Sequence, residues 1–180
     1  EVDEHAARRR VPADAEGAEA IRLAEHVMLG HLADAPALQR FVQALPPALV
    51  EAEVAAAGLQ RANGCLSLMQ GGAPADLPPL LRWRSLHNAV LGLALTGRAA
   101  LGSELLARDE AAALASPELA ERQAYAAAAN NIAAGLRQEP RRSADVDALL
   151  IQAAGIARRV WEKAGNWMNV ARAEYQLALS

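Results

Sequence analysis

Histidine and cysteine side chains are the first candidates for metal binding, and this 180-residue chain has four histidines and one cysteine. His26 and His31 are five residues apart, which separates them by about 140° around an α-helix and keeps them off a common face. Glu25 precedes His26, but no second histidine stands at the spacing of a zinc-protease motif. Cys65 has no cysteine to pair with, and its apolar neighbours indicate a small buried side chain. The sequence therefore predicts no metal site and no cofactor.

The sequence also lacks motifs for phosphate binding and for nucleophilic catalysis. The pair Gly71-Gly72 is followed by Pro74, which is typical of a helix end and not of a phosphate-binding loop. Acidic neighbours such as Asp109 and Glu110 are expected on solvated helix faces. Three serines lie inside predicted helices without the turn that exposes a serine nucleophile: Ser67, Ser85 and Ser103. We therefore predict no catalytic residues and no enzymatic activity.

The charge of the chain limits the partners that it can bind. The net charge is -3 and the isoelectric point is near 5.8, so no surplus of positive charge attracts nucleic acid. The basic run at residues 8–10 is short and adjoins three acidic residues, which indicates a solvated tail. No apolar stretch approaches the roughly 18 residues of a membrane span, and the N-terminus lacks a signal-peptide pattern. We therefore expect a cytoplasmic protein that binds neither nucleic acid nor membranes.

The composition predicts an all-α fold. The chain contains 45 alanines and 26 leucines but only 15 valine, isoleucine and threonine residues together. Alanine and leucine are strong helix formers, whereas β-branched residues favour strands. Aromatic residues make up only 3% of the chain, so small side chains must form the core and the helices must pack closely.

Proline and glycine residues divide the chain into seven or eight expected helices. Ser116 is expected to cap a helix that has Pro117 at its first position, and Ser143 or Asp145 is expected to cap the next. Short connections predict that consecutive helices pack as antiparallel neighbours. The first helix is expected to bury Ile21, Ala24, Val27, Met28 and Leu32 on one face. The expected ranges are 13–32, 36–45, 48–70, 80–96, 97–115, 116–138, 143–165 and 167–180.

An internal repeat is present in the second half of the chain. Residues 86–93 align with residues 129–136 at an offset of 43, which pairs Asn88 with Asn131. Residues 175–178 form a weaker third copy at an offset of 45. Such periods are typical of stacked helix pairs. The sequence therefore predicts a tail over residues 1–12, irregular helices over 13–75, and repeated helix pairs over 80–180, the last pair being incomplete.

The repeated part resembles the tetratricopeptide-repeat (TPR) family. Residues 84–115 resemble one repeat, with Gly97 at the turn, Gly102 at a small-residue position and Leu106 at a large apolar position. Residues 126–166 are similar to the longer kinesin-light-chain variant, in which Ala133 takes a small-residue position. Asp109 departs from the pattern, because the family usually has alanine there. The resemblance implies an all-α right-handed solenoid of stacked antiparallel helix pairs.

The resemblance also implies where a partner binds, because the first helix of each pair lines a concave surface. Asparagine and glutamine can hydrogen-bond a peptide backbone, and arginine can hold a carboxylate. We therefore expect a non-catalytic scaffold that binds a protein or peptide, with an acidic segment or a free C-terminus favoured. The implied peptide-binding residues are Arg84, His87, Asn130, Asn131, Arg137, Arg172, Tyr175 and Gln176. The alternative for these residues is that the asparagines satisfy neighbouring backbone groups and the arginines are solvated.

A second function remains open, together with one expectation about assembly. The alternative is a helical enzyme or small-ligand sensor domain, with a pocket among the N-terminal helices that includes His26, His31 or Cys65. The helix over residues 167–180 is apolar more than halfway round, so we expect a fragment of a longer protein or a homodimer through this helix. Trp83, Trp161 and Trp167 are expected to fill the core or helix interfaces.

Overall fold

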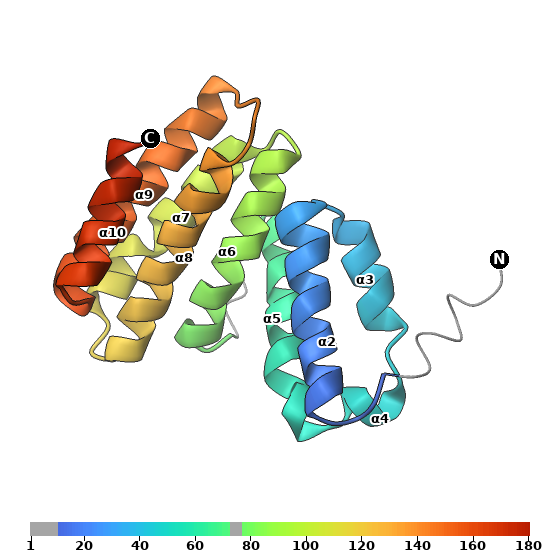
Figure 1. The fold of residues 1–180 in the computed structure, drawn as a ribbon. Helices are drawn as coiled ribbons and strands as arrows, with labels where there is room; N and C mark the ends of the chain where they lie inside the picture. Colours follow the sequence, from blue (N-terminus) through green and yellow to red (C-terminus); the bar gives the residue numbers. More distant parts are fainter. Residues whose placement is uncertain (1–10, 73–76) are drawn as a thin grey trace.

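The computed structural model describes residues 11–72 and 77–180, in which all regular elements are helices and no strand is present (Figure 1). This confirms the all-α prediction for the described part of the chain. The basic run at residues 8–10 and Pro74 lie outside the described residues. The elements are α2 (Ala15–Glu25), η1 (His26–His31), α3 (Ala35–Gln43), α4 (Pro47–Val50), α5 (Glu53–Met69), α6 (Pro79–Leu95), α7 (Ala99–Ala115), α8 (Leu119–Arg137), α9 (Ala144–Ala164) and α10 (Trp167–Ala178).

Several helix ends follow directly from local sequence chemistry. The Ser143 side chain accepts a hydrogen bond from the Val146 N–H and caps α9 as predicted. Gly97 lies between α6 and α7 with φ at +76°, a conformation that glycine adopts without a steric penalty. Asn166 caps α10, and the Asn169 side chain accepts a hydrogen bond from the Asn166 N–H. Ser143 and Gly97 thus lie at helix ends that the sequence pattern predicted.

Two of the predicted helices differ from the structure, one by a break and one by its start. The expected helix over 48–70 is divided into the single turn α4 and the longer α5, because Ala52 has an extended backbone between them. The helix expected to begin at Ser116 begins instead at Leu119, with Glu118 in the cap position. Proline disfavours helical geometry in the preceding residue, and Ser116 is accordingly extended, with ψ at 131°. The Ser116 hydroxyl still accepts a hydrogen bond from the Glu118 N–H at 3.2 Å.

The first predicted helix changes character halfway along its length. From His26 to His31 the chain is a π-helix, and the Leu32 N–H donates to the Val27 carbonyl five residues earlier. The wider turn rotates the apolar face away from the α-helical prediction. Val27 and Leu32, which were expected in the core, are 44% and 66% exposed, whereas Leu29 is fully buried. The predicted buried face is therefore wrong at Val27 and Leu32, whereas Met28 is partly buried against the core.

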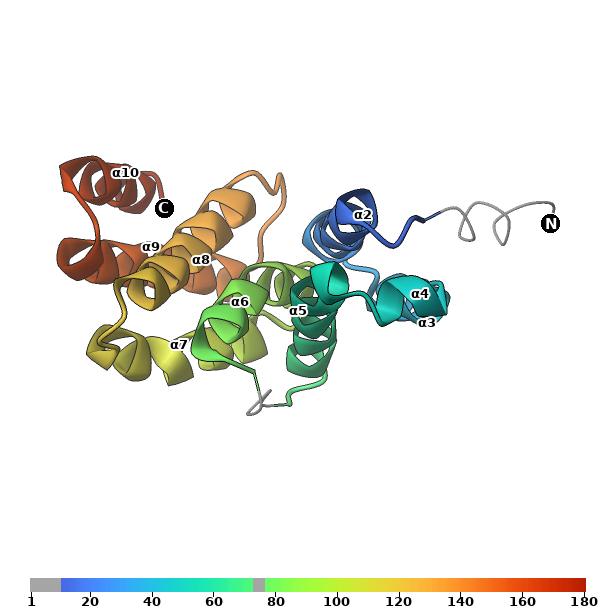
Figure 2. The same ribbon diagram turned by 90° about the horizontal axis from the view of Figure 1, so that it is seen from below.

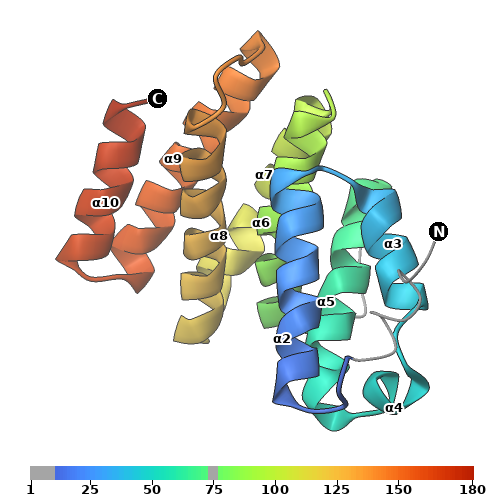
Figure 3. The same cartoon turned by 45° about the vertical axis from the view of Figure 1, so that its right-hand side comes forward.

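The helices of the repeated region alternate between two layers. α6, α8 and α10 run in one direction, and α7 and α9 run the opposite way behind them (Figures 1 and 3). Gly102 of α7 packs against Val90 of α6 and Leu149 of α9, and the absence of a side chain allows this close approach. Figure 2 shows α6 and α8 recessed between α2 on one side and α10 on the other. The described fold thus has a concave side, with α6 and α8 at its floor.

The N-terminal helices join this array in a way that the sequence did not predict. α5 and α6 pack as parallel neighbours, since the Ser85 hydroxyl lies beside the Arg61 carbonyl and Met69 packs against Gly92 further along both helices. The segment formed by α2 and η1 is also parallel to α6, and α3 and α4 pack beside α5. The prediction that consecutive helices are always antiparallel is therefore wrong between α5 and α6.

The tryptophans divide between core and surface. Trp83 is buried and its ring meets Tyr125 edge to face, with ring centroids 5.9 Å apart. Trp161 is half-buried, but Trp167 is 77% exposed, so its predicted role as a core residue is wrong. Cys65 is fully buried, as predicted.

Among the described residues, no helix combines the length and the apolar character that crossing a membrane would require.

Candidate functional site

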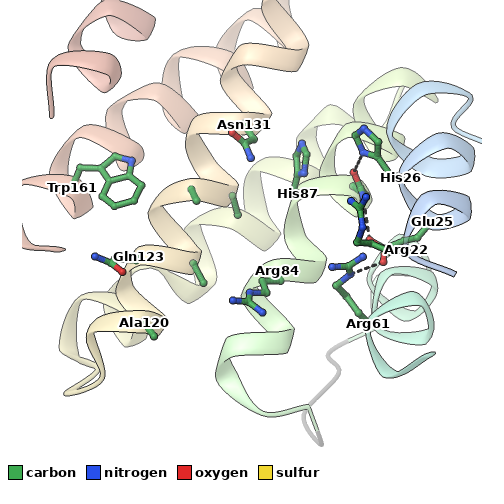
Figure 4. A pocket seen from close by; sticks show the side chains of 14 residues that line it. Arg22, Glu25, His26, Arg61, Arg84, His87, Ala120, Gln123, Asn131 and Trp161 are labelled. Carbon is green, nitrogen blue, oxygen red and sulfur yellow. Dashed lines mark hydrogen bonds and ion pairs between the residues drawn. The ribbon is translucent and has the colours of Figure 1, made fainter. Parts of the chain in front are cut away.

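A hollow of about 570 Å³ lies on the concave side, with α2 and η1 on one flank, α8 on the other and α6 at its base (Figure 4). We call it the polar groove. Its polar lining comes mainly from Arg22, Arg61, Arg84, His87 and Asn131. Several alanines make the α8 wall smooth, and the Trp161 ring of α9 closes the far side. An open groove with convergent polar groups is suited to binding an extended ligand.

A buried carboxylate organises one wall of the polar groove. Glu25 is fully buried and accepts hydrogen bonds from Arg61 Nε at 2.5 Å, Asn88 Nδ2 at 2.8 Å and the Cys65 thiol at 3.4 Å. These three donors come from α5 and α6, so Glu25 links α2 to both helices. A buried carboxylate is stable only when it is paired and hydrogen-bonded, and Glu25 meets both conditions. The network holds Arg61 in a fixed orientation at the groove.

The same network sets the tautomer of His26. Asn88 donates its amide N–H to Glu25, and its Oδ1 atom lies 3.3 Å from Nδ1 of His26. An amide oxygen can only accept a hydrogen bond, so His26 carries a proton on Nδ1. In the neutral ring, Nε2 of His26 therefore presents its lone pair to its neighbours.

His26 and His31 are in direct contact, contrary to the sequence-based geometry. Their Nε2 atoms are 3.2 Å apart and their rings meet edge to face. The π-helical turn causes this contact, because residues five apart share a face when each turn holds more residues than an α-helical turn. The centroid of the His87 ring lies 6.2 Å from that of His26. Across residues 11–72 and 77–180, however, no three histidine, cysteine or acidic side chains are arranged to hold a metal ion.

The titration of two groups reflects their burial. Burial lowers the pKa of His87 to about 4, and the nearby His26 and Arg61 act in the same direction. His87 is therefore a neutral hydrogen-bonding group at neutral pH. Burial also raises the pKa of the Cys65 thiol, and the Glu25 carboxylate adds to the effect. Cys65 therefore remains a thiol and serves as a weak donor within the network.

One end of the polar groove is cationic. Arg22, Arg61 and Arg84 line both this groove and an adjoining hollow of about 290 Å³. Glu19 pairs with Arg22, and Glu25 pairs with Arg61. Within the described residues no ion pair holds the exposed side chain of Arg84. Three guanidinium groups thus face two carboxylates, which leaves net positive charge at this end.

The other end of the polar groove leads into an apolar hollow. This second hollow has a volume of about 250 Å³ and shares His26, His87 and Asn131 with the groove. Its apolar lining comes from Leu91 and Leu95 of α6 and from Leu136 of α8. His31, Gln138 and Glu139 also line it. The two spaces form one surface along α6, cationic at one end and more apolar at the other.

The structure divides the predicted peptide-binding residues into two groups. Arg84, His87 and Asn131 line the polar groove. Asn130 and Arg137 are seven residues apart and therefore share a different face of α8, where the Arg137 guanidinium lies 5.7 Å from the Tyr175 ring of α10. The remaining members of this second group are Arg172 and Gln176, which also belong to α10. The predicted single column of donors thus occupies two different surfaces.

Sequence analysis missed several residues of the groove. Arg22, Arg61 and Gln123 all line it. Glu25 was considered only as part of a metal-binding motif with His26, and Asn88 was noted only as a repeat position. Glu25 lies one helical turn after the buried Ile21, on a face that is otherwise apolar. A carboxylate at such a position is a usable signal for a buried ion pair, although the sequence does not show which residue pairs with it.

The chain matches no protein-family model, no curated protein and no solved structure. The residues and geometry of the groove are therefore the basis for assigning a function.

Proposed function

We propose that this chain is a non-catalytic protein-interaction module built of TPR-like helix pairs, and that it binds an extended acidic peptide segment in the polar groove. The observation that carries the proposal is the convergence of Arg84, His87 and Asn131 on one open groove. Arg84 and His87 belong to α6 and Asn131 belongs to α8, the helices that contain the two clearest copies of the repeat.

The packing of the second half supports the TPR-like part of the proposal. Helices α6 and α8 pack side by side as parallel neighbours, and each is followed by an antiparallel partner, α7 or α9. A solenoid of helix pairs has this alternation, and its first helices line the concave surface. α2 and η1 extend the same side by packing on α6, and they form the second wall of the groove.

The chemistry of the groove favours a peptide with negative charge. The Asn131 amide is exposed and can both donate to and accept from a peptide backbone. Arg84 and the outward nitrogens of Arg61 can hold a carboxylate through charge-assisted hydrogen bonds. His87 is neutral at neutral pH and adds a hydrogen-bonding group without adding charge.

The proposal is tested by fluorescence anisotropy with a labelled glutamate-rich peptide and a matched lysine-rich peptide. The wild-type chain should bind the acidic peptide only, and Arg84→Ala should weaken binding by about tenfold, the loss expected for one charge-assisted hydrogen bond. Arg172→Ala is the matched control, since Arg172 is an exposed arginine on α10 and not in the groove. Equal binding of both peptides, or equal effects of the two variants, would contradict the proposal.

A small-ligand sensor is the second candidate, and one observation favours it. His26 is oriented by Asn88 and Glu25 and contacts His31 beside the apolar hollow, which is a more ordered arrangement than peptide binding needs. A thermal-shift screen with small dicarboxylates distinguishes the two functions. Stabilisation by such a ligand that is lost in His26→Ala, together with no peptide binding, would favour the sensor.

A further inference from the structure

We infer that the groove recognises its peptide at two points, a carboxylate at the cationic end and an apolar side chain in the apolar hollow. The inference rests on the proposed function and adds the sequence pattern of the ligand. It follows from the polarity of one continuous surface: Arg22, Arg61 and Arg84 lie at one end, and Leu91, Leu95 and Leu136 lie at the other.

The cationic end is built to receive a carboxylate. Its three guanidinium groups come from three different helices, α2, α5 and α6, and they surround the junction of two hollows. Glu25 uses only the Nε atom of Arg61, which leaves the terminal nitrogens of that side chain available. Because the Glu25 network already fixes Arg61, binding would cost little further side-chain ordering there. A planar guanidinium in a fixed position favours a carboxylate over an uncharged group.

The apolar hollow is built to receive a side chain. It lies between η1 and the C-terminal half of α8. Ala134 and Gly135 line it from α8, and their small size leaves the space open. Its volume of about 250 Å³ can hold a side chain the size of leucine, and burial of such a side chain favours binding. His26, His87 and Asn131 lie between the two ends, where they can hydrogen-bond the backbone that connects the two anchors.

The helical rise of α6 sets the spacing of the two anchors. Arg84, Leu91 and Leu95 all belong to α6, so Leu91 lies about 10 Å and Leu95 about 16 Å from Arg84 along the axis. An extended peptide advances about 3.3 Å per residue. The acidic and apolar residues of the ligand should therefore be about three to five positions apart.

The spacing is tested with short labelled peptides of glycine and serine that carry one glutamate and one leucine and have blocked ends. The separation of the two residues is varied in both orders, and binding is measured by fluorescence anisotropy. Affinity should peak at a separation of about three to five residues in one order, and should fall about tenfold for adjacent residues or for glutamine in place of glutamate. Affinity that does not depend on separation overturns the inference.

Three variants separate the anchors from each other. Leu95→Gln should weaken the best peptide but leave a peptide without leucine unchanged, whereas Arg84→Ala should weaken both. Ala134→Phe fills the hollow from α8 without removing a core side chain, so it tests the same anchor if Leu95→Gln unfolds. Binding that depends on Arg84 but not on either hollow variant would overturn two-point recognition alone. Failure of every peptide to bind would overturn the proposed function as well.

Discussion

Nε2 of His26 lies 3.2 Å from Nε2 of His31, although the two residues are five positions apart in the chain. In an α-helix these side chains would point in different directions, but the π-helical segment His26–His31 places them on one face. The same segment brings Gly30 close to Asn88, where a Cβ atom would lie 2.9 Å from Asn88 Oδ1. A local change of helix type thus forms one wall of the groove and permits the close packing of α6.

Glu25→Gln should destabilise the fold much more than Glu19→Gln. Both residues pair with an arginine, but Glu25 is fully buried and Glu19 is half exposed. Loss of the buried carboxylate leaves Arg61 and two other donors without their charged acceptor, at a cost of about 3 kcal/mol. Urea denaturation would show the difference as a lower midpoint for Glu25→Gln only. Equal midpoints would show that the network contributes little to stability.

Ala133→Leu should overpack the contact between α8 and α9. Ala133 is buried in α8, the position at which the repeat pattern predicts a small residue. Added side-chain volume in such a site costs about 1 to 3 kcal/mol in the free energy of unfolding. Ala148→Leu on the exposed face of α9 is the control and should leave the denaturation midpoint unchanged. An unchanged midpoint for Ala133→Leu would show that the helix pair has space at this crossing.

Folding stability should decrease as the pH falls from about 6.5 to about 4. Burial, with His26 and Arg61 nearby, lowers the pKa of His87 from 6.5 to about 4, so within this window the unfolded chain takes up a proton that the folded chain does not. The free energy of unfolding loses at most about 3 kcal/mol from this group. Its full contribution is present above pH 6.5. In His87→Gln the decrease should be smaller by that amount, whereas the exposed His31→Gln should retain it.

The exposed apolar side of α10 should cause the chain to self-associate. Trp167 and Tyr175 are 77% and 61% exposed, and Met168 and Leu179 are nearly half exposed on the same helix and its end. Sedimentation over a concentration series should show a dimer that Leu179→Glu shifts towards monomer. Leu119→Glu is the matched control, because Leu119 is similarly exposed at the start of α8. A monomer at all concentrations with an ordered α10 would contradict the prediction.

The helices themselves were predictable because the information that forms them is local. Alanine and leucine favour helix whatever their partners, and Ser143 and Gly97 act on the backbone within a few residues. The burial of Trp83, Cys65 and Ala133 was also predictable, because it follows from the apolar pattern of single helices. For these features, residues that are close in the sequence are sufficient to determine the structure.

The groove depended on contacts between residues far apart in the chain. Glu25 meets Arg61, Cys65 and Asn88 across separations of 36, 40 and 63 residues, and no local pattern indicates those partners. The choice of a π-helix at His26 and the parallel packing of α5 on α6 were likewise outside the sequence prediction, because local propensities favour an ordinary helix and a short antiparallel return. The sequence by itself determined where helices form and which positions are apolar. Only the tertiary structure decided which polar side chains face one another, because burying a charge requires a partner and distant segments supply it.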